Sequence, residues 1–279
     1  MGTPLEYGAM APSADEWLGT CRRATAGVRE MLAGWSTTAQ RAVQTGRGEG
    51  GDNALVIDRA AEDVIFAELD ALHAAGGRFT AVSEERGEVD YGDPGVRVVI
   101  DPIDGSLNAK RTMPQHSFSL AVARGTTMAD VEVAYVYDFG TDEEWTATRG
   151  GGATLDGARL DPALPERRAP DGRLELLGIE SADPRWVAEV AEDLVPLAYR
   201  IRALGSIALT LCQVAAARLD AMTSLKRARA VDAAAGQLIV REAGAVYAPL
   251  DMELDVNPRA PVMAARSQAT LDVLHALVG

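Results

Sequence analysis

In the N-terminal half of the chain, an apolar strand runs directly into two aspartates separated by a turn. Residues 98–106 read VVIDPIDGS, so Asp101 stands at the end of the apolar run. Pro102 has a fixed φ and no N–H to donate, so we expect the sheet ladder to stop there. Gly105 lets the backbone bend tightly, and residues 106–110 can begin a short helix. The carboxylates of Asp101 and Asp104 should therefore return to one neighbourhood.

This junction offers ligands for a metal ion and for a phosphate group at one place. Mg²⁺ prefers hard oxygen ligands, which the two aspartates and the Ile103 carbonyl supply. Phosphate binds backbone N–H groups at a helix start, which Gly105 and Ser106 supply. Either aspartate alone would usually be a turn former or a cap. The whole string is far more specific than its parts.

Two further carboxylates could join this cluster. Glu84 follows the apolar residues 79–82, and ligands gather where the strands of an open sheet end. Taken alone, Glu84 and Glu85 would usually be solvated. Asp232 precedes an alanine-rich helical segment, where its ordinary role is that of an N-cap. A capping carboxylate is held rigidly, so the two roles are compatible.

The chain alternates between helical and strand-like patterns, which indicates a mixed α and β fold. At residues 13–32 the helix opens with a capping box made by Ser13 and Glu16. The other expected helices are residues 53–75, 184–194, 206–217, 232–242 and 268–277. The expected strands are residues 79–82, 96–100, 118–122, 131–137, 144–147, 174–179, 199–202, 219–223 and 262–264, with one more between the glycines at 150–152 and 157.

A polar, proline-bearing stretch at residues 161–172 is expected to be a domain boundary. It would separate an N-terminal α+β domain (1–160), which carries the metal motifs, from a C-terminal α/β domain (161–279). The C-terminal domain would contribute Asp232 and the substrate pocket. With 279 residues, one large domain or two closely packed domains is the natural expectation.

Composition narrows the classes of function. A net charge of -14 repels the phosphate backbone of nucleic acid, so no nucleic-acid partner is expected. Two cysteines without a paired motif favour neither a disulfide scaffold nor a zinc site. They fit a reducing compartment. No apolar run is long enough to span a bilayer, and the N-terminus does not read as a secretory signal. We expect a cytoplasmic protein without a membrane partner.

With these motifs in order, the sequence resembles the inositol monophosphatase superfamily. That group includes inositol monophosphatases, archaeal-type fructose-1,6-bisphosphatases and phosphoadenosine phosphate phosphatases. Residues 53–62 (NALVIDRAAE) are similar to its D-x-x-T-x-x-D-x-x-A-E segment, and SEE at 83–85 and DPIDGS follow. VDAAAG at 231–236 with EAGA at 242–245 is similar to the W-D-x-A-A-G…E-A-G-G signature. The resemblance runs from about residue 13 to the end and implies a layered α/β/α/β/α sandwich.

The resemblance also implies a Mg²⁺-dependent phosphomonoesterase with two to three ions. Glu84, Asp101 and the Ile103 carbonyl would hold one ion. Asp101, Asp104 and Asp232 would hold a second, and a weaker third would lie near Glu84. A homodimer is expected by the same analogy.

The remaining roles also follow from the resemblance. Asp58, Glu84 and Ser106 would be catalytic, with Ser106 paired to Asp58 and orienting the attacking water. Asp104 and the N–H groups of Gly105 and Ser106 would bind the phosphate. The sugar pocket would be lined by Arg202, Gly205 and Ser206. The glycine-rich loop at 46–52 would be a flap over the site.

The sequence indicates the type of reaction more clearly than it indicates the substrate. Ala109 and Val231 stand where the family commonly has an aromatic residue and a tryptophan, and the early threonine is missing. The basic tract at residues 226–229, with Lys226 and Arg227, would suit a second phosphate or be a solvated loop. Inositol-1-phosphate and fructose-1,6-bisphosphate are the expected substrates. Histidinol phosphate, 3'-phosphoadenosine 5'-phosphate and an inactive binding protein with this fold remain alternatives.

Overall fold

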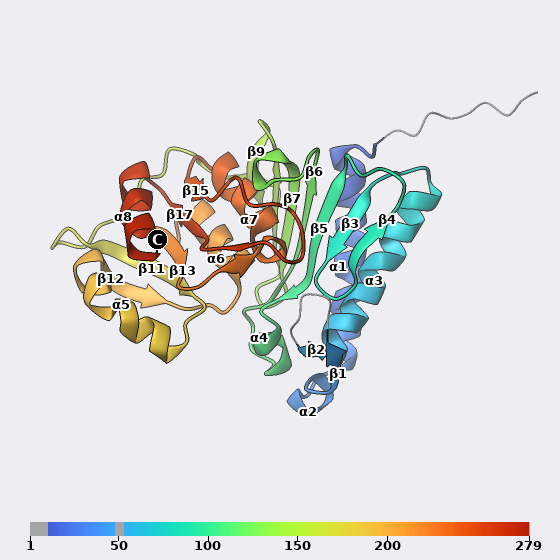
Figure 1. The fold of residues 1–279 in the computed structure, drawn as a ribbon, viewed down its shortest axis with the longest axis horizontal. Coiled ribbons are helices and arrows are strands. Elements are labelled where there is room, and N and C mark those ends of the chain that lie inside the picture. Colours follow the sequence, from blue (N-terminus) through green and yellow to red (C-terminus); the bar gives the residue numbers. More distant parts are fainter. Residues whose placement is uncertain (1–10, 48–52, 279) are drawn as a thin grey trace, which may run out of the picture.

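Two main sheets alternate with helices in five layers, in the order helix, sheet, helix, sheet, helix (Figure 1). The structure is a computed structural model that describes residues 11–47 and 53–278. The mixed α/β fold expected from the sequence is confirmed. No helix in the described part of the chain is both long and apolar enough to cross a membrane.

The larger sheet has eight strands in the order β10-β9-β8-β7-β6-β5-β3-β4. All neighbours are antiparallel except β3 and β5, which run parallel. The strands are β3 (Thr80–Ser83), β4 (Gly87–Asp90), β5 (Arg97–Asp104), β6 (Ser117–Ala123), β7 (Val131–Asp138), β8 (Glu143–Thr148), β9 (Gly152–Leu155) and β10 (Ala158–Arg159).

The smaller sheet has the order β12-β11-β13-β17-β15, with β12, β11 and β13 parallel. Its strands are β11 (Leu174–Glu180), β12 (Ala198–Arg202), β13 (Ala221–Ser224), β15 (Val246–Ala248) and β17 (Met263–Ala265). Two small ribbons pair β1 (Gln44–Arg47) with β2 (Asn53–Leu55), and β14 (Ala228–Arg229) with β16 (Arg259–Ala260).

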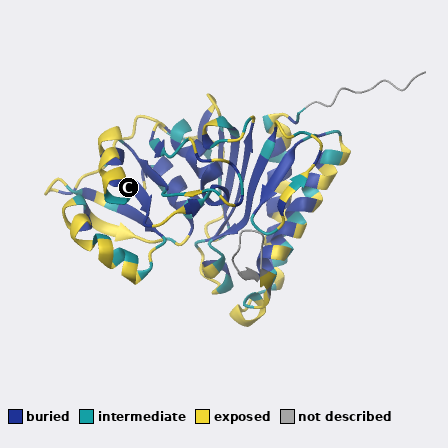
Figure 2. Cartoon of the chain, in the orientation of Figure 1, coloured by how far each residue is buried: buried dark blue, intermediate teal, exposed yellow. Residues whose placement is uncertain are grey.

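Helices fill the three remaining layers. The outer face of the large sheet is covered by α1 (Ala14–Gly34) and α3 (Val56–Ala74), whereas α6 (Ile207–Ala215) and α7 (Ala230–Glu242) lie between the sheets. The outer side of the small sheet carries α5 (Pro184–Leu197) and α8 (Gln268–Val278). Figure 2 shows most of both sheets and the central helices buried, whereas the edge strand β12 and the outer helix faces are exposed. Two short helices, α2 (Thr38–Arg41) and α4 (Ser106–Lys110), and a 3₁₀ turn (Met128–Asp130) complete the chain.

Local sequence signals explain where several elements begin. The predicted capping box is present, because Ser13 accepts from the Glu16 N–H and Glu16 accepts from Ser13. The predicted helix start at residue 53 is wrong. Residues 53–55 form β2 paired with β1, and α3 begins at Val56, where Asp58 accepts from the Leu55 N–H at 3.1 Å. Of the predicted flap, residues 48–52 lie outside the described residues.

The prediction that Pro102 ends the sheet ladder is also wrong. Pairing of β5 with β6 is interrupted between Asp101 and Asp104, and it resumes with Asp104 opposite Ser117. Proline removes one donor and forces an irregularity, but β6 continues alongside and pairs again beyond it. Because pairing resumes at Asp104, both aspartates remain part of β5 rather than lying in a free loop.

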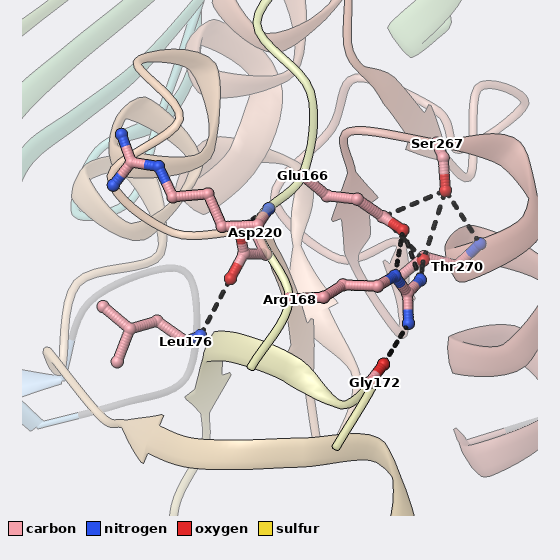
Figure 3. Close-up of polar contacts among 8 residues, drawn as sticks. Glu166, Arg168, Gly172, Leu176, Asp220, Ser267 and Thr270 are labelled. Carbon is pink, nitrogen blue, oxygen red and sulfur yellow. Dashed lines mark hydrogen bonds and ion pairs between the residues drawn. The ribbon is translucent and has the colours of Figure 1, made fainter. Parts of the chain in front are cut away.

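The boundary stretch at residues 161–172 connects β10 of the large sheet to β11 of the small one, and it is tied down (Figure 3). Glu166 pairs with Arg168 and accepts from Thr270 Oγ1 at 2.7 Å. Asp220 accepts from the N–H groups of Arg167 and Leu176 at 2.6 and 2.8 Å. Because α6 and α7 of the C-terminal half pack on the large sheet, the halves share a core. The division into two domains stays a prediction.

Candidate active site

Glu84 and Asp101 meet at one sheet edge because their strands are parallel neighbours. Ser83 pairs with Ile100, so Glu84, which directly follows β3, lies beside Asp101, where the pairing of β5 with β6 is interrupted. The Asp101 residue is 1% exposed, and the side chain of Glu84 is 15% exposed. The predicted gathering of carboxylates at this edge is what the strand pairing produces.

The turn after Asp101 is held by its own polar groups. Asp101 Oδ1 accepts from the Ile103 N–H at 3.0 Å, and the Ser106 hydroxyl donates to the Ile103 carbonyl at 2.8 Å. Gly105 has φ +91°, a left-handed conformation that favours glycine. The amides of Gly105 and Ser106 lie at the first turn of α4, where N–H groups have no acceptor within the helix.

Asp104 connects this turn to the C-terminal half of the chain. Its Oδ2 accepts from the Ser206 hydroxyl at 2.5 Å and from the Ala208 N–H at 2.7 Å, at the start of α6. Ser206 is 1% exposed and also caps α6 by accepting from the Leu209 N–H. Ser206 was expected to line the sugar pocket, and in the structure its hydroxyl instead positions Asp104.

Asp58 and Asp232 occupy equivalent places on two helices. Each is the third helical residue and accepts from the N–H of the residue before its helix: Asp58 from Leu55 at 3.1 Å, and Asp232 from Arg229 at 2.9 Å. Asp232 is thus a helix-start residue, as the ordinary interpretation required, although not the N-cap itself. Asp58 Oδ1 is buried with no hydrogen-bond partner in the described part of the chain.

Burial dominates the electrostatics of the site. Burial, together with the negative charge of nearby Asp232, raises the pKa of Glu84 to about 7 and that of Asp104 to about 8. Burial raises the pKa of Asp101 well above its ordinary value, with Glu84, Asp104 and Asp232 adding to the effect. Burial also raises the pKa of Asp58 to about 6, and the hydrogen bond that Asp58 accepts from the Leu55 N–H opposes this rise. Such a group of carboxylates is stable in its charged form only with a compensating cation.

One cation is already present in the cluster, and it is the guanidinium of Arg229. Its Nη1 lies 2.6 Å from Glu84 Oε1, and its Nη2 lies 3.0 Å from Asp232 Oδ1. The sequence places Arg229 in the basic tract, among the residues that would suit a second phosphate, and gives it no part in the carboxylate cluster. Arg229 directly precedes α7, and Asp232 is the third residue of that helix. This three-residue spacing at a helix start is the signal that could have identified Arg229.

A cavity of about 570 Å³ lies directly beside these carboxylates. Its lining includes Asp104, Arg229 and Asp232, together with Gln115, Glu180 and the loop carrying Gly205. Glu180 was not anticipated. Its carboxylate accepts from the Leu204 and Gly205 N–H groups at 3.0 Å each and from Thr210 Oγ1 at 2.6 Å. Like Glu84, it ends an apolar strand, and that shared pattern could have predicted it.

The other predicted substrate contacts lie elsewhere in this structure. Lys226 pairs with Glu189 at 3.1 Å, and Lys226 and Arg227 line a separate cavity of about 410 Å³. Arg202 is exposed and donates to the Ile201 carbonyl. These three side chains are not brought to the carboxylate cluster, although Gly205 is brought to the cavity beside it.

The chemistry of the donor set suits Mg²⁺. Glu84, Asp101, Asp104 and Asp232 offer hard oxygens, and their mutual repulsion calls for divalent charge. As the side chains stand, no group of three or more His, Cys, Asp or Glu among the described residues is arranged to hold an ion. The donor chemistry fits Mg²⁺, and binding through Glu84 Oε1 or Asp232 Oδ1 requires Arg229 to release those oxygens.

The inositol monophosphatase family model matches residues 15–278, and the chain belongs to this family. It is 36% identical over 209 residues to the Nus factor SuhB of Escherichia coli strain K12, covering 74% of each chain. It is 32% identical over 239 residues to an inositol-1-monophosphatase of Mesorhizobium japonicum, covering 81% of this chain and 83% of the relative. A solved inositol monophosphatase–fructose 1,6-bisphosphatase superimposes with a TM-score of 0.78 at 26% identity, covering 94% of this chain and 99% of that one.

The raised pKa values predict how stability depends on pH. Glu84 and Asp104 have folded-state pKa values of about 7 and 8, above the ordinary 4.5 and 3.8, so the fold favours their protonated forms. The contribution of these two groups to folding stability is complete below their ordinary pKa values, and it is lost as the pH rises to about 8. Because metal binds the deprotonated form, the Mg²⁺-induced rise in Tm should grow from pH 5.5 to 8.5. Differential scanning fluorimetry with and without Mg²⁺ at each pH measures this, and a shift independent of pH would contradict it.

Proposed function

We propose that this protein is a Mg²⁺-dependent phosphomonoesterase that hydrolyses a small cyclitol or sugar phosphate, with inositol-1-phosphate as the favoured substrate. The observation that carries the proposal is the convergence of Glu84, Asp101, Asp104 and Asp232 beside a cavity of about 570 Å³. They come from the end of β3, the end of β5 and the start of α7. The activity for which the Mesorhizobium relative is named supports the same reaction.

Each part of the turn has a task in this reaction. Two to three Mg²⁺ ions bound by the carboxylates and the Ile103 carbonyl would activate water and offset charge on the phosphate. The first-turn amides of Gly105 and Ser106 would bind phosphate oxygens. Asp58, with one buried oxygen free of hydrogen bonds in the described residues, and the Ser106 hydroxyl would orient the attacking water.

The cavity favours a monophosphate of a neutral polyol. Among its described lining residues, the basic side chain is Arg229, whereas Gln115 and the side-chain oxygen of Asn108 offer polar groups suited to hydroxyls. A bisphosphate would need a second cationic contact, and Lys226 and Arg227 line the other cavity. Fructose-1,6-bisphosphate is therefore the second candidate, supported by the name of the superimposed structure.

Histidinol phosphate and 3'-phosphoadenosine 5'-phosphate are further candidates within the same chemistry, and an inactive binding protein is the alternative outside it. Against the inactive protein stands the presence of all four carboxylates in one cluster. We also propose a cytoplasmic homodimer, on the resemblance alone. Light scattering at micromolar concentration tests the assembly, and a mass of about one chain would exclude it.

A substrate panel tests the proposed function. Purified protein with Mg²⁺ should release phosphate fastest from inositol-1-phosphate, more slowly from fructose-1,6-bisphosphate, and not at all after chelation with EDTA. The panel should include histidinol phosphate and 3'-phosphoadenosine 5'-phosphate. Faster release from either of these would show that the preferred substrate is not a cyclitol or sugar phosphate. No release from any ester at saturating Mg²⁺ would favour the inactive binding protein.

A further inference from the structure

Arg229 occupies carboxylate oxygens of the cluster that a metal ion would use. Asp232 Oδ2 accepts from the backbone N–H of Arg229, and Asp232 Oδ1 accepts from its guanidinium. Both oxygens of this carboxylate are thus engaged by one residue. The guanidinium also binds Glu84 Oε1 at 2.6 Å. An ion that binds through Glu84 Oε1 or Asp232 Oδ1 must displace the guanidinium.

The pairing is buried rather than a surface salt bridge. The side chains of Arg229, Glu84 and Asp232 are 12%, 15% and 11% exposed. This positive charge faces a group of four carboxylates, since Asp101 and Asp104 lie within electrostatic range of Glu84 and Asp232. Removing it without replacement would leave buried like charges uncompensated, which is strongly unfavourable. Arg229 therefore acts as the counter-ion of the cluster in the metal-free protein.

The cavity beside the cluster can accommodate the displaced Arg229 side chain. Arg229 already lines the cavity beside the cluster, together with Asp104 and Asp232. Its backbone is fixed by β14 and by the N–H bond to Asp232, so only the side chain need turn. A guanidinium is planar and binds two oxygens of a phosphate at once, and this cavity is where the ester would lie.

We propose that Arg229 is a two-position residue that competes with Mg²⁺ for Glu84 and Asp232 and, once displaced, binds the phosphate group in the cavity. This inference rests on the proposed function, because it takes the cluster as a Mg²⁺ site. The competition weakens the apparent affinity for Mg²⁺ by the fraction of molecules in which the guanidinium is withdrawn. It also ensures that the phosphate contact forms only after the metal has entered.

Arg229→Gln separates this proposal from an ordinary structural ion pair. We expect its Mg²⁺ affinity, measured by isothermal titration calorimetry, to be tighter by roughly tenfold or more, since the guanidinium no longer competes. Its Tm without metal should fall, and its affinity for inorganic phosphate in saturating Mg²⁺ should weaken by roughly tenfold. Lys226→Gln is the matched control, because it removes a neighbouring positive charge that faces Glu189, and it should change neither affinity.

The outcomes distinguish the two proposals. Parental protein that binds Mg²⁺ and releases phosphate, with a variant that binds Mg²⁺ no more tightly, would overturn the role of Arg229 and leave the function standing. Parental protein that binds no Mg²⁺ would overturn both. If Arg229→Gln folds only with Mg²⁺, this supports the counter-ion role, and Arg229→Lys then supplies the affinity test. Lysine keeps the charge without the two-oxygen geometry, so weaker phosphate binding with Mg²⁺ affinity within about threefold of the parent is expected. Unchanged phosphate affinity in Arg229→Lys would contradict the proposal that displaced Arg229 binds the phosphate group.

Discussion

Asp101→Asn is expected to lower Mg²⁺-dependent phosphate release by a factor on the order of 10³ or more while leaving the fold intact. Asp101 is 1% exposed, and Glu84, Asp104 and Asp232 all act on its charge, so it is the carboxylate placed to serve both expected metal positions. Asparagine keeps an oxygen that can accept from the Ile103 N–H, as Asp101 Oδ1 does at 3.0 Å. The turn should therefore persist while the negative charge is lost.

Although Asp101→Asn should lose activity, its thermal stability without metal should not fall. Burial and the neighbouring carboxylates raise the pKa of Asp101, so its charged form costs free energy in the metal-free protein. Tm without Mg²⁺ should stay the same or rise, and Mg²⁺ should raise it less than in the parent. Both are measured by scanning calorimetry alongside the kinetic assay. Near-parental turnover would show that the site is misassigned.

Asp220→Asn is the matched control for this experiment. Asp220 is also buried, at 3% exposed, but it lies by the boundary stretch and accepts from the Arg167 and Leu176 N–H groups (Figure 3). An amide offers one acceptor oxygen for these two donors. We expect lower stability and parental turnover per folded molecule, which is the reverse of the result for Asp101.

What the sequence predicted well is what neighbouring residues determine among themselves. The capping box at Ser13 depends on residues three apart, and the return of Asp104 toward Asp101 depends on one turn. The position of Glu84 beside Asp101 needed one further assumption, that β3 and β5 are parallel neighbours, and the pairing of Ser83 with Ile100 meets it.

What the sequence did not predict depends on contacts between distant segments. Lys226 and Arg229 look alike in one basic tract, yet the chain turns between them, and they end against Glu189 and Glu84 respectively. β5 continues past Pro102 because β6 lies alongside it, a fact that the proline itself does not carry. Glu180 was missed because its partners, such as the Leu204 N–H, come from a loop 24 residues away.

Gly105→Ala is expected to destabilise the protein by on the order of 2–4 kcal/mol and to lower turnover by roughly 100-fold. The backbone at Gly105 has φ +91°, which an L side chain rarely adopts. A Cβ there would lie 2.8 Å from the Gln115 carbonyl oxygen and 3.0 Å from the Gly205 carbonyl oxygen. Both contacts are backbone atoms, so neither can be relieved by rotating a side chain.

The loss of turnover follows from what lies on either side of Gly105. Asp104 precedes it with a carboxylate fixed by Ser206 and Ala208, and Ser106 follows it at the start of α4. To relieve the contact, the turn must move relative to these anchors, and a shift of about 1 Å is enough to misplace a reacting group.

Gly157→Ala separates this effect from backbone strain alone. Gly157 has φ +76°, and no atom lies within 4 Å of the position that a Cβ would take there. Its substitution should cost about 1–2 kcal/mol and leave turnover unchanged. Chemical denaturation and the phosphate-release assay measure the two quantities in both variants. Equal losses of stability and full activity in both would show that the turn tolerates displacement, and the phosphate contact assigned to its amides would then have to be abandoned.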